Sequence, residues 1–390
     1  DALEKIAALS LLLWGLWLGL ARGGFRDTTA AERGLFVCFG LMLTAALLSY
    51  LVNGRPETAL KMLPKYARLL LFIPLYVLFR DVLQTRHFWL ALGAVAVVLG
   101  GWNLLEGAGG VEGCRKEQCF PGQINGTIGR TPYGLISLAL AGVLAAGAGY
   151  YRRRYPQLLV PLLIAAMLVL YGALGSGNRT ALLALPGVLI IWLGLSWRNG
   201  QLRARSLAVL IIALISAIAL AWPVIQARVD NAQQEIAAYN QADAENSPSF
   251  GSRLHWWRGA LNIFLDHPVV GVGPRQYRSA LAERVTAGLE PPQALPHHPH
   301  NEYLSAAAGQ GVIGLLALLL LWGGPLTQYW RGCASTASER QELGMAGILM
   351  LGAFAQGATT AAIFDLSAFS NFYILLSAAL CGLVNSRVKS

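Results

Sequence analysis

Long apolar runs recur along this chain, and they constrain its fold more than any other feature of the sequence. Each run has about 16 to 22 residues, which is enough for one helix to cross the hydrocarbon core of a bilayer. The run at 62–79 is the weakest, because Pro64, Lys65 and Arg68 interrupt its start. The eleven runs lie near residues 3–21, 34–52, 62–79, 88–105, 132–150, 158–175, 180–197, 206–225, 303–323, 343–364 and 370–385.

The composition agrees with a membrane protein and excludes several other classes. Only 13% of the 390 residues are charged and 55% are hydrophobic, with a mean hydropathy of +0.50. A soluble domain of this size cannot cover so much apolar surface with so few charges, and neither a disordered chain nor a disulfide-framed secreted domain has this composition. We therefore predict an all-α, multi-pass helical bundle with about eleven to twelve transmembrane helices.

The charge of +10 and the pI near 9.6 suggest nucleic acid only if the basic residues gather on one face. Instead, many of them lie in four short loops, which the positive-inside rule places in the cytoplasm if the runs alternate. The segments 106–131 and 226–302 and the turns at 175–178 and 365–367 then face outward. The basic loop residues are Arg152, Arg153, Arg154, Arg198, Arg203, Arg205, Arg331, Arg340, Arg387 and Lys389.

This topology divides the chain into a transmembrane bundle at 1–225, an outward loop at 226–302 and C-terminal transmembrane helices at 303–390. Counting back places residue 1 outside, which is unusual for a multi-pass bacterial protein. We expect either a segment upstream of Asp1 or a further crossing within the basic stretch 55–80.

The five cysteines fall into two groups. Cys38, Cys333 and Cys381 lie in or beside apolar runs, where cysteine acts as a small hydrophobic residue. Cys114 and Cys119 share an outward loop, where an oxidising periplasm favours a disulfide over two free thiols.

The outward loop at 226–302 is the only long hydrophilic stretch. We expect a polar helix over 228–242 and a second helix that Ser252 caps, with Leu254, Trp257, Leu261 and Phe264 at helical spacing. A turn at 271–274 and a short helix near 276–286 follow. The acidic residues Asp243 and Glu245 lie in a polar stretch and are interpreted as a solvated loop. The loop ends at His297, His298, Pro299, His300 and Asn301, and Asn301 is placed to cap the next membrane helix.

His300 is the candidate base, because it lies at the start of that helix. The helix dipole disfavours a protonated imidazole there, and a neutral histidine can accept a proton. One alternative is a loop or cap hydrogen bond, which the neighbouring His297 and His298 make less favourable. The other is a metal site, which we rank lowest because no carboxylate or cysteine stands at ligand spacing.

Three arginines at outward positions are candidates for binding a phosphate group. Arg179 follows the glycine-containing turn Ser176–Asn178 at the start of a run, and Arg253 and Arg258 lie beside Trp256 and Trp257. The ordinary alternatives are interface snorkelling for Arg179 and a solvated helix face for the other two, and we favour the solvated face for Arg258.

Three blocks of sequence together resemble the O-antigen ligase and polymerase superfamily of multi-pass glycosyltransferases, over roughly residues 160–320. They are Ser176-Gly177-Asn178-Arg179-Thr180; Ser252-Arg253-Leu254-His255-Trp256-Trp257 followed by Asp266-His267-Pro268-Val269-Val270-Gly271-Val272-Gly273; and His298-Pro299-His300-Asn301-Glu302-Tyr303-Leu304 running on to Gly311-Val312-Ile313-Gly314.

The resemblance implies a GT-C-like fold in a Gram-negative inner membrane, with the active site facing the periplasm. It also implies inverting transfer of O-antigen from undecaprenyl diphosphate to a sugar of the lipid A core, with no nucleotide, metal or other cofactor and no nucleic acid. By matched position, Arg179 and Arg253 hold the diphosphate and His300 acts on the acceptor hydroxyl, with His298, Asn301 and Arg258 as possible supporting residues.

Three alternatives to an O-antigen ligase stay open at this point. An O-antigen polymerase and a protein O-oligosaccharyltransferase share these motifs. A transporter of lipid-linked glycans belongs to a different class, and it predicts ionisable residues inside the helices. The runs contain few such residues, since Glu106 and Asp365 lie near helix ends, so the sequence favours surface chemistry over transport.

Overall fold

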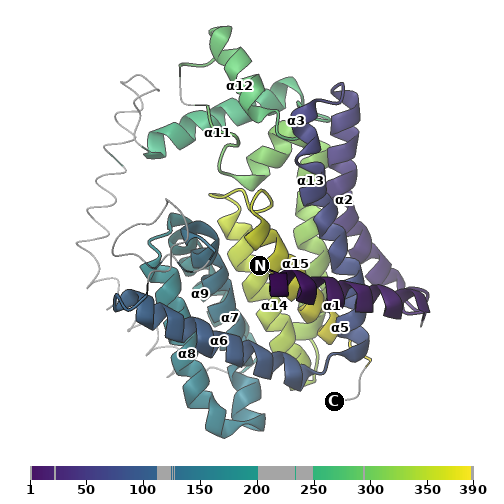
Figure 1. Cartoon of the computed structure of the whole chain (residues 1–390), viewed down its shortest axis with the longest axis vertical. Helices are drawn as coiled ribbons and strands as arrows, with labels where there is room; N and C mark the ends of the chain where they lie inside the picture. The colour runs from purple at the N-terminus through teal and green to yellow at the C-terminus, as the bar shows by residue number, and fades with distance from the viewer. Residues whose placement is uncertain are drawn as a thin grey trace. The chain divides into compact units, whose positions relative to one another are not determined.

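The computed structural model describes residues 2–21, 23–111, 124, 126, 128–200, 233, 249–292 and 295–387. All regular elements in these ranges are helices (Figure 1). They are α1 (Ala2–Ala21), α2 (Ala30–Val52), α3 (Glu57–Leu60), α4 (Leu63–Ala67), η1 (Arg68–Leu71), α5 (Phe72–Val82), α6 (Thr85–Gly107), α7 (Arg130–Arg154), α8 (Pro156–Gly175), α9 (Arg179–Arg198), α11 (Ser249–Asp266), α12 (Tyr277–Thr286), α13 (Glu302–Cys333), α14 (Ser338–Gly357) and α15 (Ser367–Val384).

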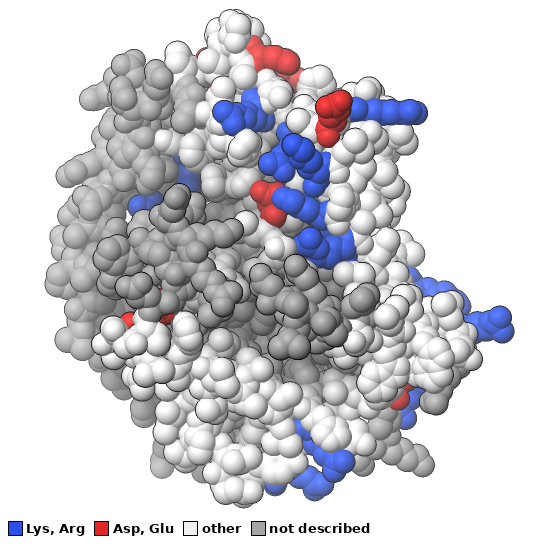
Figure 2. Space-filling model, viewed as in Figure 1, with Lys and Arg blue, Asp and Glu red and all other residues white. Residues whose placement is uncertain are grey.

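The multi-pass helical fold is confirmed. Within the described ranges, eight helical segments are long and apolar enough to cross a membrane. Ten of the eleven predicted runs overlap helices, although α14 ends at Gly357 and the run at 343–364 was predicted to continue to 364. Helices α1 and α14 are the two outside those eight segments, and the run near 206–225 lies outside the described residues. Val98 and Ile190 are each 70% exposed, as expected of side chains that face lipid. Figure 2 likewise shows broad areas of surface that carry no charged side chain.

Several predictions fall on residues that the structure does not describe. These are the polar helix at 228–242, the acidic pair Asp243 and Glu245, and the two thiols of Cys114 and Cys119. The other three cysteines are free, with Cys333 and Cys381 buried and Cys38 half-buried.

The chain forms two compact units, of which the larger comprises residues 1–44, 64–192 and 317–390. In this unit α7 packs against both α8 and α14, and α5 packs against α1 and α15. Helix α6 also packs against α8 and α7, and glycines allow these close approaches: a Cβ on Gly147 of α7 would meet the ring of Trp89, and one on Gly172 of α8 would meet the amide of Asn103. Small residues at helix contacts are typical of membrane bundles, where van der Waals packing holds the helices together.

A buried arginine in this unit was missed in the sequence, because it lies one residue beyond the run at 62–79. Arg80 of α5 is fully buried, and its guanidinium donates to Glu32 of α2 (2.9 Å), to Asp81 (2.7 Å) and to the carbonyl of Gly24 (3.0 Å). Glu32 also accepts from the backbone N–H of Thr29 (2.6 Å), whose hydroxyl accepts from the N–H of Glu32, so these two residues form a capping box. The buried charge is thus satisfied by fixed partners, as burial of an ion requires.

The smaller unit comprises residues 45–63 and 193–316. Here α11 packs on α12 through a buried cluster of Ala260, Ile263, Tyr277, Leu281 and Ala308, with Trp256 against it. The short helix near 276–286 is therefore confirmed as α12. The predicted cap is wrong, since α11 begins at Ser249 and Ser252 lies inside its first turn.

The predicted apolar spacing on α11 does not identify its buried face. Leu261 and Leu265 are exposed, whereas Trp256, Ala260 and Ile263 contact the core. Apolar residues occur on more than one face of α11. Their helical spacing therefore predicts a helix but does not identify which face packs against the core.

The loop after α11 pairs through its backbone with α13, at a point where α13 is interrupted. Gly311 has φ 66° and ψ −159°, a conformation that breaks the helix. Around it, the N–H groups of Val272 and Gly273 donate to the carbonyls of Ala308 (3.0 Å) and Gly309 (2.9 Å). In the other direction, the N–H of Val312 donates to Pro268 (2.8 Å). These hydrogen bonds satisfy backbone groups that the break in α13 would otherwise leave unpaired.

Glycine is required at this junction for steric reasons. A Cβ on Gly311 would lie 2.2 Å from the carbonyl oxygen of Val269, and one on Gly271 (φ 64°) would lie 2.5 Å from the backbone nitrogen of Gln310. The end of α2 adds further bonds: the Ser49 hydroxyl lies 2.6 Å from the carbonyl oxygen of Val270, and the Asn53 amide donates to the carbonyl of Gly271 (3.1 Å). The Gly-Val-Gly and Gly-Val-Ile-Gly blocks are therefore two sides of one contact.

Replacing Gly311 by alanine should destabilise the protein, because its conformation is almost exclusive to glycine and the new methyl group meets the Val269 carbonyl. We expect a loss of about 1–3 kcal/mol, the usual cost of such backbone strain, and a lower Tm of the detergent-solubilised protein. Gly323→Ala is the matched control, since it lies in the same helix with nothing within 4 Å of the added Cβ. Equal melting temperatures for the two variants would contradict this account of the junction.

Candidate functional site

The segment from His297 to Asn301 leads directly into α13, and a helix cap fixes the end that joins the helix. The Asn301 side chain accepts from the backbone N–H of Leu304 (3.0 Å), which confirms Asn301 as the helix cap. His300 has φ 52°, an uncommon backbone conformation for a residue other than glycine. A strained residue at a helix start is a reason to look for function there.

Contacts with α11 and with His298 hold His300 in this conformation. Its backbone N–H donates to Nδ1 of His298 (3.2 Å), and the two rings lie 4.4 Å apart. The ring of Trp256 lies 5.4 Å from that of His300, and the indole N–H of Trp257 donates to the carbonyl of Pro299 (2.9 Å). Both tryptophans stand beside arginines in the sequence, but their contact with this segment was not predicted.

The surroundings of His300 keep its imidazole neutral. Burial is the largest cause, and the neighbouring His298 and the positive charge of Arg253 add to it, so that the pKa of His300 falls to about 4 from 6.5. His300 is therefore a proton acceptor at neutral pH, although a weaker base than an ordinary histidine. The structure thus brings Arg253, His298 and His300 together in one unit, whereas His297 is exposed.

Arg179 lies at the first residue of α9, in the other unit, and its side chain is exposed. The turn before it is rigid. The Ser176 hydroxyl accepts from the N–H of Asn178 (3.2 Å), and the Asn178 side chain accepts from the N–H of Thr180 (3.0 Å). Gly177 has φ 58°, which favours glycine at this position of the Ser-x-x-Arg-Thr block.

A buried carboxylate in the α11–α12 layer was not singled out in the sequence. Glu290 is 3% exposed and accepts from the Asn262 amide (2.5 Å), with Nε of Arg284 at 3.7 Å. Burial and the positive charge of Arg258 lower the pKa of the nearby His255, which is itself buried. The negative charge of Glu290 acts in the opposite direction and raises that pKa. Arg258 itself is exposed. No motif in the sequence marks Glu290, because its position depends on how the chain folds back from α12.

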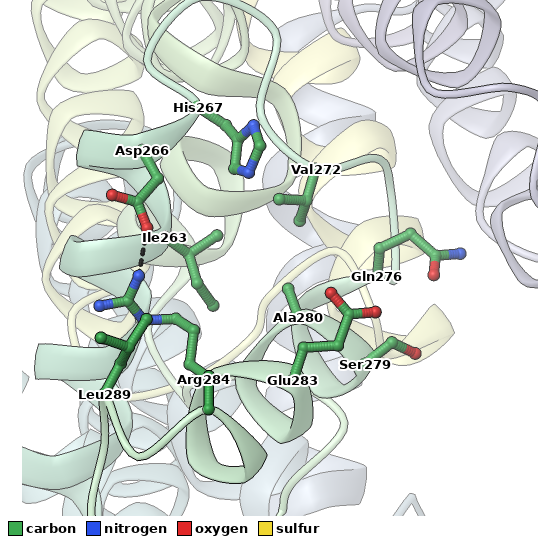
Figure 3. Close-up of a pocket in the computed structure, with 11 residues that line it drawn as sticks. Ile263, Asp266, His267, Val272, Gln276, Ser279, Ala280, Glu283, Arg284 and Leu289 are labelled. Atoms are coloured by element: carbon green, nitrogen blue, oxygen red, sulfur yellow. Dashed lines mark hydrogen bonds and ion pairs between the residues drawn. The ribbon is translucent and has the colours of Figure 1, made fainter.

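A pocket of about 420 Å³ opens between the end of α11 and α12 (Figure 3). Asp266 and His267 approach from the end of α11, and Gln276, Ser279, Glu283 and Arg284 belong to the start and body of α12. An ion pair joins Arg284 to Asp266 across the pocket. Elsewhere the lining is apolar, with Ile263, Val272, Ala280, Ala287 and Leu289.

Three histidines in four positions raised the question of a metal centre. In the part of the chain that the structure describes, no three or more His, Cys, Asp or Glu residues are grouped so as to hold a metal ion. In the histidine segment, His298 and His300 contact each other, and His300 also contacts Trp256.

Part of the chain is similar to a known family and to known bacterial proteins. Residues 164–319 match the family model described as O-Antigen ligase. An uncharacterised protein of Haemophilus influenzae is 24% identical over 325 residues, which cover 82% of this chain and 78% of that protein. The O-antigen ligase of Escherichia coli K12 is 27% identical over 199 residues, which cover 48% of this chain and 44% of that protein. The segment matched by the family model contains Arg179, Arg253 and His300.

The titration of His300 tests the geometry described above without any assay of activity. In protein labelled with ¹⁵N-histidine, the resonance lost in His300→Gln should titrate near pH 4 in the unmodified chain. Arg253→Ala should raise this pKa, because removing a nearby positive charge stabilises the imidazolium.

Arg258→Ala is the matched control for that titration. It should raise the pKa of His255, which lies within reach of its charge, and should leave His300 unchanged. A His300 resonance that titrates near 6.5 in the unmodified protein would overturn the description of this site.

Proposed function

We propose, on the premise that residues 164–319 form a domain of the O-antigen ligase family, that this protein is an O-antigen ligase of the inner membrane. It transfers O-antigen from undecaprenyl diphosphate to a sugar hydroxyl of the lipid A core on the periplasmic face. The observation that carries this proposal is a half-buried, neutral His300 at the start of α13, within reach of the positive charge of Arg253. A proton acceptor next to a fixed positive charge suits a reaction in which a hydroxyl attacks and a diphosphate leaves.

The proposed reaction is a single displacement. The acceptor oxygen bonds to the anomeric carbon of the donor while the bond from that carbon to the phosphate oxygen breaks, which inverts the configuration. The electron pair leaves with undecaprenyl diphosphate, and the hydroxyl proton passes to His300. Diphosphate is a good leaving group, so no paired acid is needed to protonate it.

His300 is too weak a base in the free protein, and donor binding corrects this. A bound diphosphate next to Arg253 offsets the positive charge that lowers the pKa of His300. The pKa then rises toward the working pH, where a general base is most effective. The base is therefore strengthened only when the donor is in place.

Arginine suits the diphosphate role because its planar guanidinium binds phosphate oxygens in pairs and stays charged. We assign this role to Arg253, from its position near His300, and to Arg179, from its sequence block and its exposed place at the start of α9. His298 and Asn301 act by positioning His300, through the Nδ1 contact and the helix cap.

Transfer by purified protein from lipid-linked donor to core acceptor should depend on these residues. His300→Ala should lower the rate by about 10²–10⁴-fold, the usual contribution of a general base. Arg253→Ala and Arg179→Ala should each lower it by about 10²–10³-fold, the usual cost of losing one group that stabilises developing charge.

Arg278→Ala, at an exposed arginine of α12 with no assigned role, is the control for the arginine variants and should retain activity, and a chelator should have no effect. The anomeric configuration of the product should be inverted. Full activity of both His300→Ala and Arg179→Ala would refute the assignment of the site.

Deletion of the gene separates the ligase from its relatives in the same superfamily. Loss of a ligase leaves bare core, with polymer accumulating on its lipid carrier. A single repeat unit on the core would instead identify a polymerase, and the loss of glycan from pilin or similar proteins would identify a protein O-oligosaccharyltransferase. Lipopolysaccharide gels and analysis of the lipid-linked pool measure these outcomes.

A further inference from the structure

The pocket between α11 and α12 is built differently from the surroundings of His300. Arg284 is held between two carboxylates, pairing with Asp266 at the pocket and lying 3.7 Å from the buried Glu290. Asn262 donates to the same Glu290 oxygen. The guanidinium is therefore fixed before any ligand enters, and its charge is already compensated.

The lining combines hydrogen-bonding groups with apolar surface. Figure 3 shows the carboxylate of Glu283 on α12 and the amide of Gln276 just before it, with Asp266 at the end of α11 and His267 just after it on the opposite side, and Ile263 between them. Carboxylate, amide, hydroxyl and imidazole groups together supply both donors and acceptors. Ile263, Val272 and Leu289 supply the apolar part.

This lining excludes some ligands and favours another. A phosphate would meet the carboxylates of Asp266 and Glu283, and an acyl chain would leave several polar groups without hydrogen bonds at a desolvation cost. A pyranose ring has hydroxyl groups around its edge and C–H groups on its faces, so it matches both parts of the lining. The volume of about 420 Å³ lies within the range of small-molecule sites.

The pocket lies apart from the proposed reaction centre. Arg253 is in the first turns of α11, whereas Asp266 is its last residue. Thirteen residues of helix separate the two positions by about 20 Å. A sugar in the pocket is therefore several units away from the sugar whose bond is broken.

We propose that this pocket is a saccharide-binding subsite that holds a sugar remote from the reacting bond, an inference that rests on the proposed function. The sugar has two possible sources, since both the donor glycan and the core acceptor are oligosaccharides. Glu283 and Gln276 bind its hydroxyls, and Arg284 supplies a fixed donor. Holding the chain here favours long glycans over short ones.

Two variants test the subsite in full-length protein in detergent. Ser279→Trp fills the pocket from an exposed position, and Glu283→Gln removes one acceptor charge without removing the Arg284 ion pairs. Glu57→Gln, on an exposed residue of α3 outside the pocket lining, is the matched control. The probes are free O-chain oligosaccharide released from the organism's own lipopolysaccharide, and core oligosaccharide from a strain without O chains.

Saturation-transfer NMR with the unmodified protein should show binding of one probe, which identifies the source of the sugar. Ser279→Trp and Glu283→Gln should weaken that binding by roughly tenfold, as expected for losing one or more hydrogen bonds to a charged group. Glu57→Gln should bind like the unmodified protein. Equal binding of the saccharide by all four proteins would overturn the proposal. Failure of the unmodified protein to bind either saccharide would overturn it as well.

Transfer assays keep this test separate from the test of the proposed function. If the O chain is the probe that binds, a donor with one sugar on its lipid diphosphate does not reach the pocket, so both pocket variants should use it at the normal rate while their use of a long donor falls by roughly tenfold. If the core is the probe that binds, the same fall should appear with the full core acceptor and be absent with a core truncated to the accepting sugar. Equal loss or equal retention on the long and short forms of the substrate that binds would refute the subsite and leave the ligase assignment standing. No transfer by the unmodified protein from either donor would refute the proposed function itself.

Discussion

The smaller unit depends on the backbone hydrogen bonds between the loop at 268–273 and the break in α13. Gly311 interrupts the helix, and the loop supplies hydrogen bonds on both sides of the interruption. The same loop connects α11 to α12. One contact therefore links the helix that carries Arg253 to the helix that begins after His300, and glycine is needed there because carbonyl oxygens occupy the space of a side chain.

In the smaller unit, the pKa of His300 is lowered by partial burial and by a nearby positive charge. His300 lies in the left-handed region, under Trp256 and beside His298, and Arg253 further disfavours its protonation. Such a histidine is pre-organised to accept a proton but is weakened by its own surroundings. Under the proposed mechanism, the substrate's negative charge removes that weakness, so binding and activation are coupled through one arginine.

Much of the fold could be predicted from the sequence, because a membrane helix is specified by the length and apolarity of a single segment. Ten runs became helices, α12 lies where it was expected, and Asn301 caps α13. Errors arose where partners far apart in the chain decide the outcome. Ser252 does not cap α11, and the apolar period of α11 did not reveal that Trp256, Ala260 and Ile263 form its buried face.

By itself the sequence determined a multi-pass helical protein, the candidate residues Arg179, Arg253 and His300, and a resemblance that the family match over 164–319 supports. These features are local, since hydropathy and short motifs are read from neighbouring residues. Only the tertiary structure decided that Arg80 is neutralised by Glu32, that Arg253 lowers the pKa of His300, and that Asp266 and Arg284 face each other across a pocket. Each of these depends on a distance between side chains that lie far apart in the chain or on different elements, and that distance is set by packing and not by spacing in the sequence.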